Sequence, residues 1–127
     1  MSEATLRKIA IVDDDDAVRN SLRFLLDVMG YQSETFESAA ELLNADLSNL
    51  ACLILDHQMP HMTGLELAER LRSDGAATPV LLVTGSSSPA IVARAAELGI
   101  KILEKPARDE DLVDFIDATQ SRVKVTG

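Results

Sequence analysis

The sequence predicts an α/β domain in which helices cover both faces of a parallel sheet. Short apolar segments alternate with amphipathic segments five times along the 127 residues, which is the pattern of repeated strand–helix units. The segments at 8–12, 51–55 and 80–83 are almost continuously apolar, as is typical of strands buried on both faces. Apolar residues make up 46% of the chain, enough for the core of one globular domain.

The first strand is expected at 8–12 and is followed by a helix over 17–29. Apolar residues recur in this helix at a spacing that places them on one face. The predicted face consists of Val18, Leu22, Leu25 and Met29. Gly30 ends the helix, because glycine readily takes the positive φ of a helix C-terminus. The next strand, at 31–36, is more polar and is therefore expected at an edge of the sheet.

Capping signals locate the next two helices. Ser38 and Glu41 have the spacing of a capping box and open a short helix, which a loop over 46–50 follows. The third strand comes next and ends in an aspartate. Thr63 and Glu66 form a second candidate capping box, so a further helix is expected to begin there.

The last two helices carry their own start signals. Ser88 is a suitable N-cap with Pro89 at the first helical position, and this helix stops at Gly99. A short fifth strand is expected at 100–103, and Asp109 opens the last helix. The buried face of that helix is predicted to include Leu112, Phe115 or Ile116, and Thr119.

Polar residues follow four of the five apolar segments, where each strand is expected to end. They are Asp13 and Asp14 after the first segment, Asp56 after the third, Thr84 after the fourth and Lys105 after the fifth. Each alone has an ordinary interpretation, because such residues cap helices and occupy turns. In a doubly wound sheet of order 2-1-3-4-5, however, these four strands are neighbours, and their carboxyl ends bring the five side chains into one cleft.

Such a cleft suits phosphoryl transfer. Several carboxylates fit a Mg²⁺ ion, which prefers oxygen ligands and leaves positions for water or phosphate. The aspartates at 13–16 also repel one another, and a nearby cation relieves that repulsion. Asp56 can serve as the nucleophile, Mg²⁺ and Lys105 can supply positive charge, and Thr84 can donate a hydrogen bond to a phosphoryl oxygen.

These motifs resemble those of the response-regulator receiver domain of bacterial two-component signalling. The matching segments are Val12-Asp13-Asp14-Asp15, Asp56-x-x-Met59-Pro60-x-Met62-x-Gly64, Val83-Thr84-Gly85 and Glu104-Lys105-Pro106. The resemblance covers about 8–123, so we expect a single receiver domain over 1–127 with short polar tails. It implies a CheY-like, flavodoxin-like fold, a three-layer (βα)5 sandwich with sheet order 2-1-3-4-5.

The resemblance also implies a phosphoacceptor. Asp56 would receive a phosphoryl group from the phosphohistidine of a sensor histidine kinase or a phosphotransfer protein. Mg²⁺ would be ligated by Asp14, Asp56 and the backbone carbonyl of Gln58, with Asp13 acting partly through water. The domain would catalyse only its own phosphorylation and dephosphorylation, and would not be an enzyme with a separate substrate.

The remaining family positions contact or tune the phosphoryl group. The resemblance implies that Thr84 and Lys105 contact it. Gln58 and Ser86 each stand two residues after a site residue, at positions where members of the family tune hydrolysis of the acyl phosphate.

Three departures from the family pattern lie on the surface built from the fourth helix, fifth strand and fifth helix. Ile102 stands where the family usually has an aromatic switch residue, the segment 99–106 is one residue shorter than is common, and Ala107 replaces a frequent phenylalanine. Isoleucine is stiff and has no polar tip, so we expect unusual signal output with intact phosphorylation chemistry. Receivers usually use this surface for a downstream protein or for a phosphorylation-dependent homodimer.

Composition excludes several other classes. A net charge of −9 argues against direct nucleic-acid binding by this chain. It lacks both an apolar run of about 18 residues, as a membrane helix needs, and the apolar core of a signal peptide at its start, so a cytoplasmic location is expected. Cys52 is expected to be a small buried hydrophobe, and His57 and His61 to be loop side chains without metal-ligand spacing.

Alternative functions remain open at this point. One is a degenerate receiver that acts by partner binding only. Another is a haloacid-dehalogenase-type phosphatase with Asp13 as nucleophile, although Ala17 replaces the threonine or valine usual there. A flavodoxin-like cofactor binder is disfavoured because aspartates, not a Ser/Thr/Gly-rich phosphate loop, follow the first strand. The chain would be either a single-domain regulator or the receiver of a longer protein.

Overall fold

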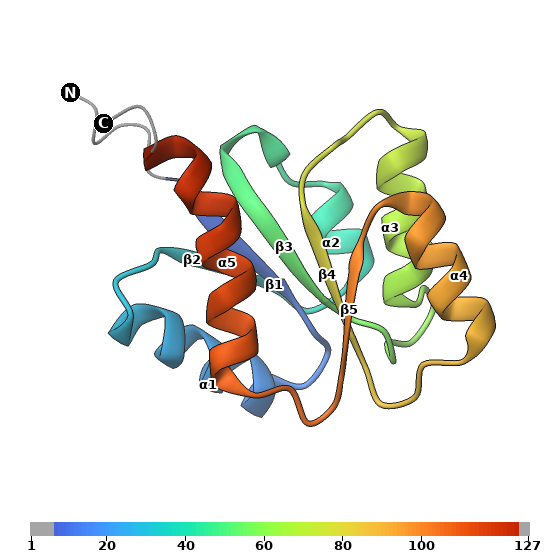
Figure 1. Cartoon of the computed structure of the whole chain (residues 1–127), viewed down its shortest axis with the longest axis horizontal. Helices are drawn as coiled ribbons and strands as arrows, with labels where there is room; N and C mark the ends of the chain where they lie inside the picture. Colours follow the sequence, from blue (N-terminus) through green and yellow to red (C-terminus); the bar gives the residue numbers. More distant parts are fainter. Residues whose placement is uncertain (1–6, 125–127) are drawn as a thin grey trace.

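The computed structural model describes residues 7–124, with side chains described up to Thr119. The strands are β1 (Lys8–Val12), β2 (Ser33–Phe36), β3 (Leu50–Asp56), β4 (Val80–Thr84) and β5 (Lys101–Glu104). The helices are α1 (Asp16–Val28), α2 (Ala39–Leu43), α3 (Gly64–Ser73), α4 (Pro89–Leu98) and α5 (Asp109–Lys124), with a short 3₁₀ helix, η2 (Leu47–Asn49). Strands and helices alternate along the chain (Figure 1), as the sequence predicts.

All five strands run parallel in one sheet with the order β2-β1-β3-β4-β5. This is the predicted order, and it puts the more polar β2 at an edge. The central strand β3 is buried along its whole length. Because every strand points the same way, the carboxyl ends of β1, β3, β4 and β5 meet at one edge of the sheet.

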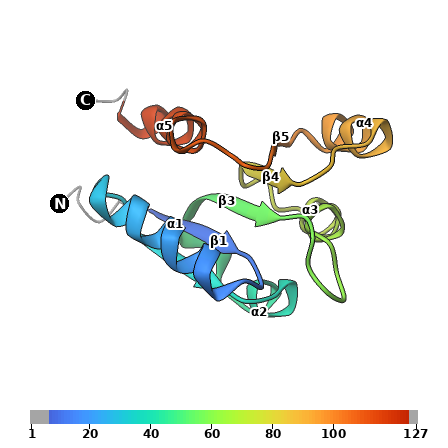
Figure 2. The ribbon, with the colours of Figure 1, turned by 90° about the horizontal axis from the view of Figure 1, so that it is seen from below.

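Helices cover both faces of the sheet. Figure 2 shows α1 and α5 on one face and α2, α3 and α4 on the other. Side chains alternate between the faces along each strand. The core on the α2–α4 side includes Ala10, Val12, Leu53, Leu55, Val80 and Leu82. The core on the α1/α5 side includes Ile9, Ile11, Cys52, Ile54 and Leu81, together with Leu112, Phe115 and Ile116 of α5.

Most of the predicted helix ends are confirmed. Thr63 and Glu66 form a complete capping box at the start of α3, and Ser88 caps α4 with Pro89 in its first turn. The α1 cap is Asp15, whose side chain accepts the amides of Ala17 and Val18. Because Asp15 caps the helix, the carboxylates of the two preceding aspartates remain available for the site.

The predicted buried face of α1 is partly wrong. Leu26 and Arg19 are the buried residues of this helix, whereas Val18 and Met29 are 39% and 48% exposed. Leu22 and Leu25 are half-buried, as expected of inward-facing positions. The helix is rotated toward Arg19, because its guanidinium donates a 2.6 Å hydrogen bond to the carbonyl oxygen of Asp13.

Two smaller predictions also need correction. The segment 46–50, expected as a loop, contains η2 and the first residue of β3. Ser38 caps α2 by accepting the amide of Glu41, but the Glu41 carboxylate accepts the amide of Glu37 and not that of Ser38. The predicted capping box is therefore only half formed.

Candidate functional site

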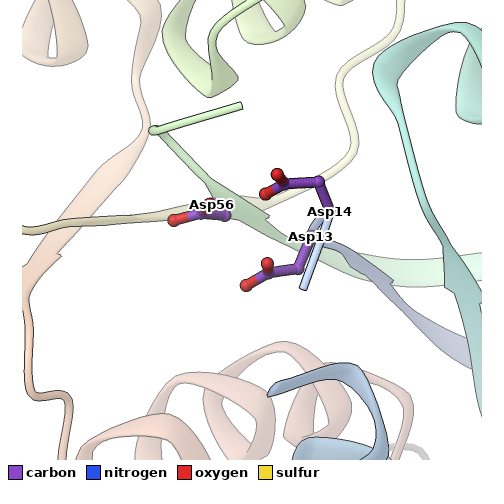
Figure 3. Close-up of side chains that lie close together, drawn as sticks. All are labelled: Asp13, Asp14 and Asp56. Atoms are coloured by element: carbon purple, nitrogen blue, oxygen red, sulfur yellow. The ribbon is translucent and has the colours of Figure 1, made fainter. Parts of the chain in front are cut away.

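Three carboxylates meet at the carboxyl edge of the sheet. Asp13 and Asp14 follow β1, and Asp56 is the last residue of β3. Val12 pairs with Leu55 in the register of these neighbouring strands, which brings the two strand ends together. One carboxylate oxygen from each aspartate lies within 4.8 Å of the others, and Figure 3 shows the three side chains around one small space.

The Asp13 side chain is constrained by burial and by a hydrogen bond from the backbone. It is buried, and its Oδ1 accepts the amide of Asp15 at 2.9 Å. Burial raises the pKa of the Asp13 carboxyl, the charges of Asp56 and Asp14 raise it further, and the Asp15 amide and Lys105 partly oppose this rise. The raised pKa reflects concentrated negative charge in a poorly solvated place, a situation that a cation relieves.

Asp56 is 5% exposed, and its Oδ1 lies 2.6 Å from the Lys105 ammonium nitrogen. The approach lacks the angles of a hydrogen bond, and Oδ1 is a buried oxygen without a hydrogen-bond donor among the described residues. The Lys105 ammonium therefore balances the charge of the Asp56 carboxylate electrostatically. Among the described residues, no donor meets the geometry of a good hydrogen bond to Oδ1. The Lys105 side chain is 41% exposed, so the ion pair lies at the border between the buried carboxylate and solvent.

Thr84 lies beside these groups but is turned away from them. It ends β4 and is fully buried. By strand alternation its side chain belongs to the α2–α4 side, whereas Asp56 belongs to the α1/α5 side. The Thr84 hydroxyl hydrogen-bonds the side-chain amide of Gln58 and the backbone of Ser86.

The remaining predicted positions are on the same edge or next to it. Gln58 and Ser86 are exposed in the loops that follow β3 and β4. Ile102 is half-buried in β5, where it pairs with Leu82 and packs against the α2–α4 core. It therefore lies on the Thr84 side of the sheet and away from the carboxylates.

The two histidines have local structural roles. The Nδ1 atom of His57 accepts the amide of Leu65 at 3.3 Å, at the start of α3. His61 takes a positive φ of 71° in the turn before that helix. Cys52 is buried as predicted, and burial raises the pKa of its thiol to about 11.

Sequence reasoning missed the positioning role of two residues. Arg19 fixes the loop after β1 through the Asp13 carbonyl, and an arginine among apolar residues of an amphipathic helix was the available signal. Gly64 starts α3 against β3: a Cβ there would lie 2.5 Å from the Asp56 carbonyl oxygen and 2.6 Å from Cδ1 of Leu82. Only glycine permits this approach, but its motif position alone did not disclose the reason.

A cavity of about 340 Å³ opens beside Asp56 between α1, α5 and the sheet. Its apolar walls include Ile11, Val18, Leu22, Ile54, Val83, Ala107 and Leu112, and Asp13, Asp56, Lys105 and Asp109 add charged groups. The phosphoacceptor candidate thus borders space on its α1/α5 side.

The fold and the strand-end carboxylates define a class of signalling domain. The family described as the response regulator receiver domain matches residues 9–117, and the chain belongs to that family. Two similar proteins are response regulators. The transcriptional regulatory protein FixJ of Bradyrhizobium diazoefficiens is 36% identical over 113 residues, 87% of this chain and 55% of its own. The response regulator protein TmoT of Ectopseudomonas mendocina is 39% identical over 111 residues, 85% of this chain and 50% of its own.

Solved structures give the same assignment. The chemotaxis protein CheY4 of Vibrio cholerae superposes with a TM-score of 0.79 and 29% identity, covering 90% of this chain and 98% of that one. The fold is therefore CheY-like, as expected. The chain spans about half the length of the curated relatives it matches. Among the residues that the structure describes, no helix is long and apolar enough to cross a membrane.

Proposed function

We propose that Asp56 is the phosphoacceptor of a two-component or phosphorelay system. The observation that carries the proposal is the state of its Oδ1: buried, without a hydrogen-bond donor, and 2.6 Å from the Lys105 ammonium. A carboxylate oxygen can act as a nucleophile toward phosphorus, and the adjacent ammonium offsets the negative charge of an approaching phosphoryl group. Family membership supports the same assignment.

The donor is a phosphohistidine of a sensor kinase or a phosphotransfer protein. A carboxylate oxygen of Asp56 forms the new O–P bond as the N–P bond breaks, and the electron pair of that bond returns to the imidazole. The imidazole takes up a proton from solvent as it leaves, so the products are an aspartyl phosphate and a neutral histidine. Lys105 stays close to the acceptor and pairs with the negative oxygens of the transferred group.

The acidic cluster fits Mg²⁺. Asp13, Asp14 and Asp56 each bring an oxygen to one small space, and the donorless Oδ1 of Asp56 is a buried polar atom in need of a partner. The ligands would be these carboxylates, Asp13 partly through water, and the backbone carbonyl of Gln58. The ion would neutralise charge on the phosphoryl oxygens. The ion would offset the burial and the neighbouring carboxylate charges that together raise the pKa of Asp13.

Asp56 is a better nucleophile than Asp13. The Asp13 Oδ1 already accepts the Asp15 amide, which engages it in the loop after β1. Asp56 instead faces a cation. This contrast and the family assignment disfavour the phosphatase alternative, and a test of both aspartates is decisive.

Phosphorylation would change a protein-interaction surface that includes α4, β5 and α5, for a downstream protein or a second copy of the chain. The net charge of −9 disfavours direct nucleic-acid binding by this chain. A sensor kinase partner is consistent with a cytoplasmic location. The only chemistry of the domain is its own phosphorylation and dephosphorylation at Asp56.

The test is the intact mass of the protein after incubation with a small acyl phosphate, with and without Mg²⁺. We expect one phosphoryl adduct that requires Mg²⁺. Asp56→Asn should abolish it because a carboxamide is not a nucleophile toward phosphorus. Asp13→Asn should slow adduct formation without moving its site.

Each contrary result has a distinct meaning. An adduct that survives Asp56→Asn but not Asp13→Asn would assign the nucleophile to Asp13. No adduct on the wild-type chain, with either the acyl phosphate or a phosphorylated histidine phosphotransfer protein, would identify a receiver that acts by partner binding only.

A further inference from the structure

The Thr84 hydroxyl has no free hydrogen-bonding capacity in this structure. It donates to the carbonyl oxygen of Ser86 at 3.0 Å and accepts the Ser86 amide at 3.2 Å. It also accepts from Nε2 of Gln58 at 3.0 Å. A hydroxyl has one proton and two lone pairs, and all three are used. Thr84 therefore cannot donate to a phosphoryl oxygen until its hydrogen bond to Ser86 breaks.

The Gln58 side chain is fixed in orientation by a second contact. Its Oε1 accepts the amide of Gly85 at 3.1 Å. A backbone amide can only donate, so the oxygen must face Gly85 and the nitrogen must face Thr84. Gln58 thus connects the loop after β3 to the end of β4 through two hydrogen bonds, one from each end of its amide.

We propose that Gln58 is a positioning residue whose side chain holds Thr84 in the rotamer it has when Asp56 is unphosphorylated. This contact between Gln58 and Thr84, the latch, opposes the active state. This inference rests on the proposed phosphorylation of Asp56. When a phosphoryl group arrives, the Thr84 hydroxyl turns to donate to it, and the bonds to Gln58 and Ser86 break. Gln58 is exposed, so water replaces its lost partners, and releasing Thr84 costs about as much as one ordinary hydrogen bond.

The same contacts give the switch a route to the surface that does not need an aromatic side chain. Ser86 stands in the loop that leads to α4, and its backbone is bound to Thr84. The next residue, Ser87, donates from its hydroxyl to Glu104 of β5, and Ser88 caps α4. Movement of Thr84 frees the Ser86 backbone and thereby the start of α4. Ile102 need not change rotamer for this signal to pass.

The experiment measures the affinity for beryllofluoride, an analogue of the phosphoryl group, in the presence of Mg²⁺. Gln58→Met keeps the side-chain length and the backbone carbonyl but removes the amide. We expect the variant to bind the analogue about fivefold more tightly, the effect of losing one ordinary hydrogen bond that opposes the bound state. Without the analogue, its Gly85 and Ser86 amide NMR signals should move toward their positions in the saturated wild-type protein.

Two controls isolate the latch. Gln32→Met makes the same chemical change at an exposed position outside the site and should leave affinity and both amide signals unchanged. In a Thr84→Val background the hydroxyl is absent, so adding Gln58→Met should no longer alter the affinity. A double-mutant cycle of this kind reports the coupling between the two side chains.

The outcomes separate this inference from the proposed function. If the wild-type chain binds no beryllofluoride and forms no phosphoryl adduct, the phosphoacceptor proposal fails and the latch falls with it. If the wild-type chain binds and Gln58→Met binds equally or more weakly, only the latch is wrong. An equal gain from Gln58→Met with valine at position 84 would also overturn it, because the effect would not act through Thr84.

Discussion

The two faces of the sheet are packed differently. On the α2–α4 side, fully buried residues from β1, β3 and β4 interlock with Leu42 of α2 and Leu67 of α3, and α3 and α4 are both capped. On the α1/α5 side, α1 has few buried residues, and a cavity of about 340 Å³ opens beside Asp56. Hollows of about 320 and 420 Å³ also lie on the α2–α4 side, beside α2 and between α4 and β5. That side is close-packed where α3 meets β3, whereas the space on the α1/α5 side adjoins the reactive carboxylate.

One side of the sheet supports the backbone of Asp56, and the other gives access to its side chain. Gly64 presses α3 against the Asp56 carbonyl from the close-packed side, which fixes the backbone of the acceptor. The side chains of Asp13, Asp56 and Lys105 border the cavity on the open side, where a metal ion or a donor needs room. We infer that the contact with α3 positions the acceptor and that the cavity on the α1/α5 side admits its reactants.

Matched leucine truncations should expose this contrast most strongly. Leu67→Ala removes a fully buried side chain of α3 and should lower the free energy of unfolding by about 3 kcal/mol. Leu22→Ala removes a half-buried side chain that already lines the cavity, so about 1 kcal/mol is expected. Urea denaturation of both variants measures the two costs. Equal losses would mean that the Leu22 side chain is packed as tightly as that of Leu67 despite the adjoining cavity.

Gly64→Ala tests the support given by the close-packed face. The new Cβ would lie 2.5 Å from a backbone oxygen and 2.6 Å from Leu82 Cδ1, so α3 or β3 must shift, at a cost of about 2 kcal/mol. The displaced Asp56 should also accept a phosphoryl group more slowly. Gly85→Ala is the control, because its nearest contact would be an ordinary 3.8 Å to Gln58 Oε1. A stable, fully reactive Gly64→Ala protein would contradict the proposed support.

The sequence predicted the fold and the meeting of Asp13, Asp56 and Lys105 because both follow from strand order. It also placed the Thr84 side chain in that cleft, from which the side chain is turned away. Once β1, β3, β4 and β5 are neighbours in a parallel sheet, Asp13, Asp56 and Lys105 must share one edge. Burial of Cys52, the positive φ of Gly30 and the end of α4 at Gly99 follow from equally local signals and are confirmed.

Features that depend on side-chain rotation were not predictable in this way. The apolar spacing of α1 suits two adjacent faces, and the hydrogen bond from Arg19 to Asp13 selects one of them. The contact of Gln58 with Thr84 joins residues 26 positions apart through rotamers that no periodicity encodes. Local sequence patterns predict which helix, strand or loop carries a side chain, whereas its rotamer and contacts depend on tertiary packing.

Ala107→Phe should reduce the contrast between the faces. Ala107 lines the cavity and packs against the α1/α5 core, so a larger apolar side chain can fill the empty space. We expect a gain of about 1 kcal/mol in unfolding free energy from the added burial. Ala77→Phe, at an exposed position, should give no comparable gain. A loss with Ala107→Phe would mean that the space is too narrow for a ring.

The smallest expected effect is on the pH dependence of the free energy of unfolding, through the Asp13 carboxyl beside the cavity. Its folded pKa is raised above 3.8, so the folded state holds this proton more tightly than the unfolded chain does. The stabilisation from this proton is complete below pH 3.8 and is lost as pH rises through the folded pKa. Asp13→Asn should abolish that decline, as pH-dependent denaturation without divalent cations can measure.

Removal of the neighbouring charge tests the cause of the shift. Burial is the larger contribution, and the Asp56 carboxylate adds to it. An NMR titration of the Asp13 carboxyl in Asp56→Asn should therefore give a pKa lower than in the wild-type chain but still raised by burial. Asp46→Asn, at an exposed aspartate before η2, should leave it unchanged. An Asp13 pKa that does not respond to Asp56 would mean that these carboxylates are too well solvated on the open face to form one site.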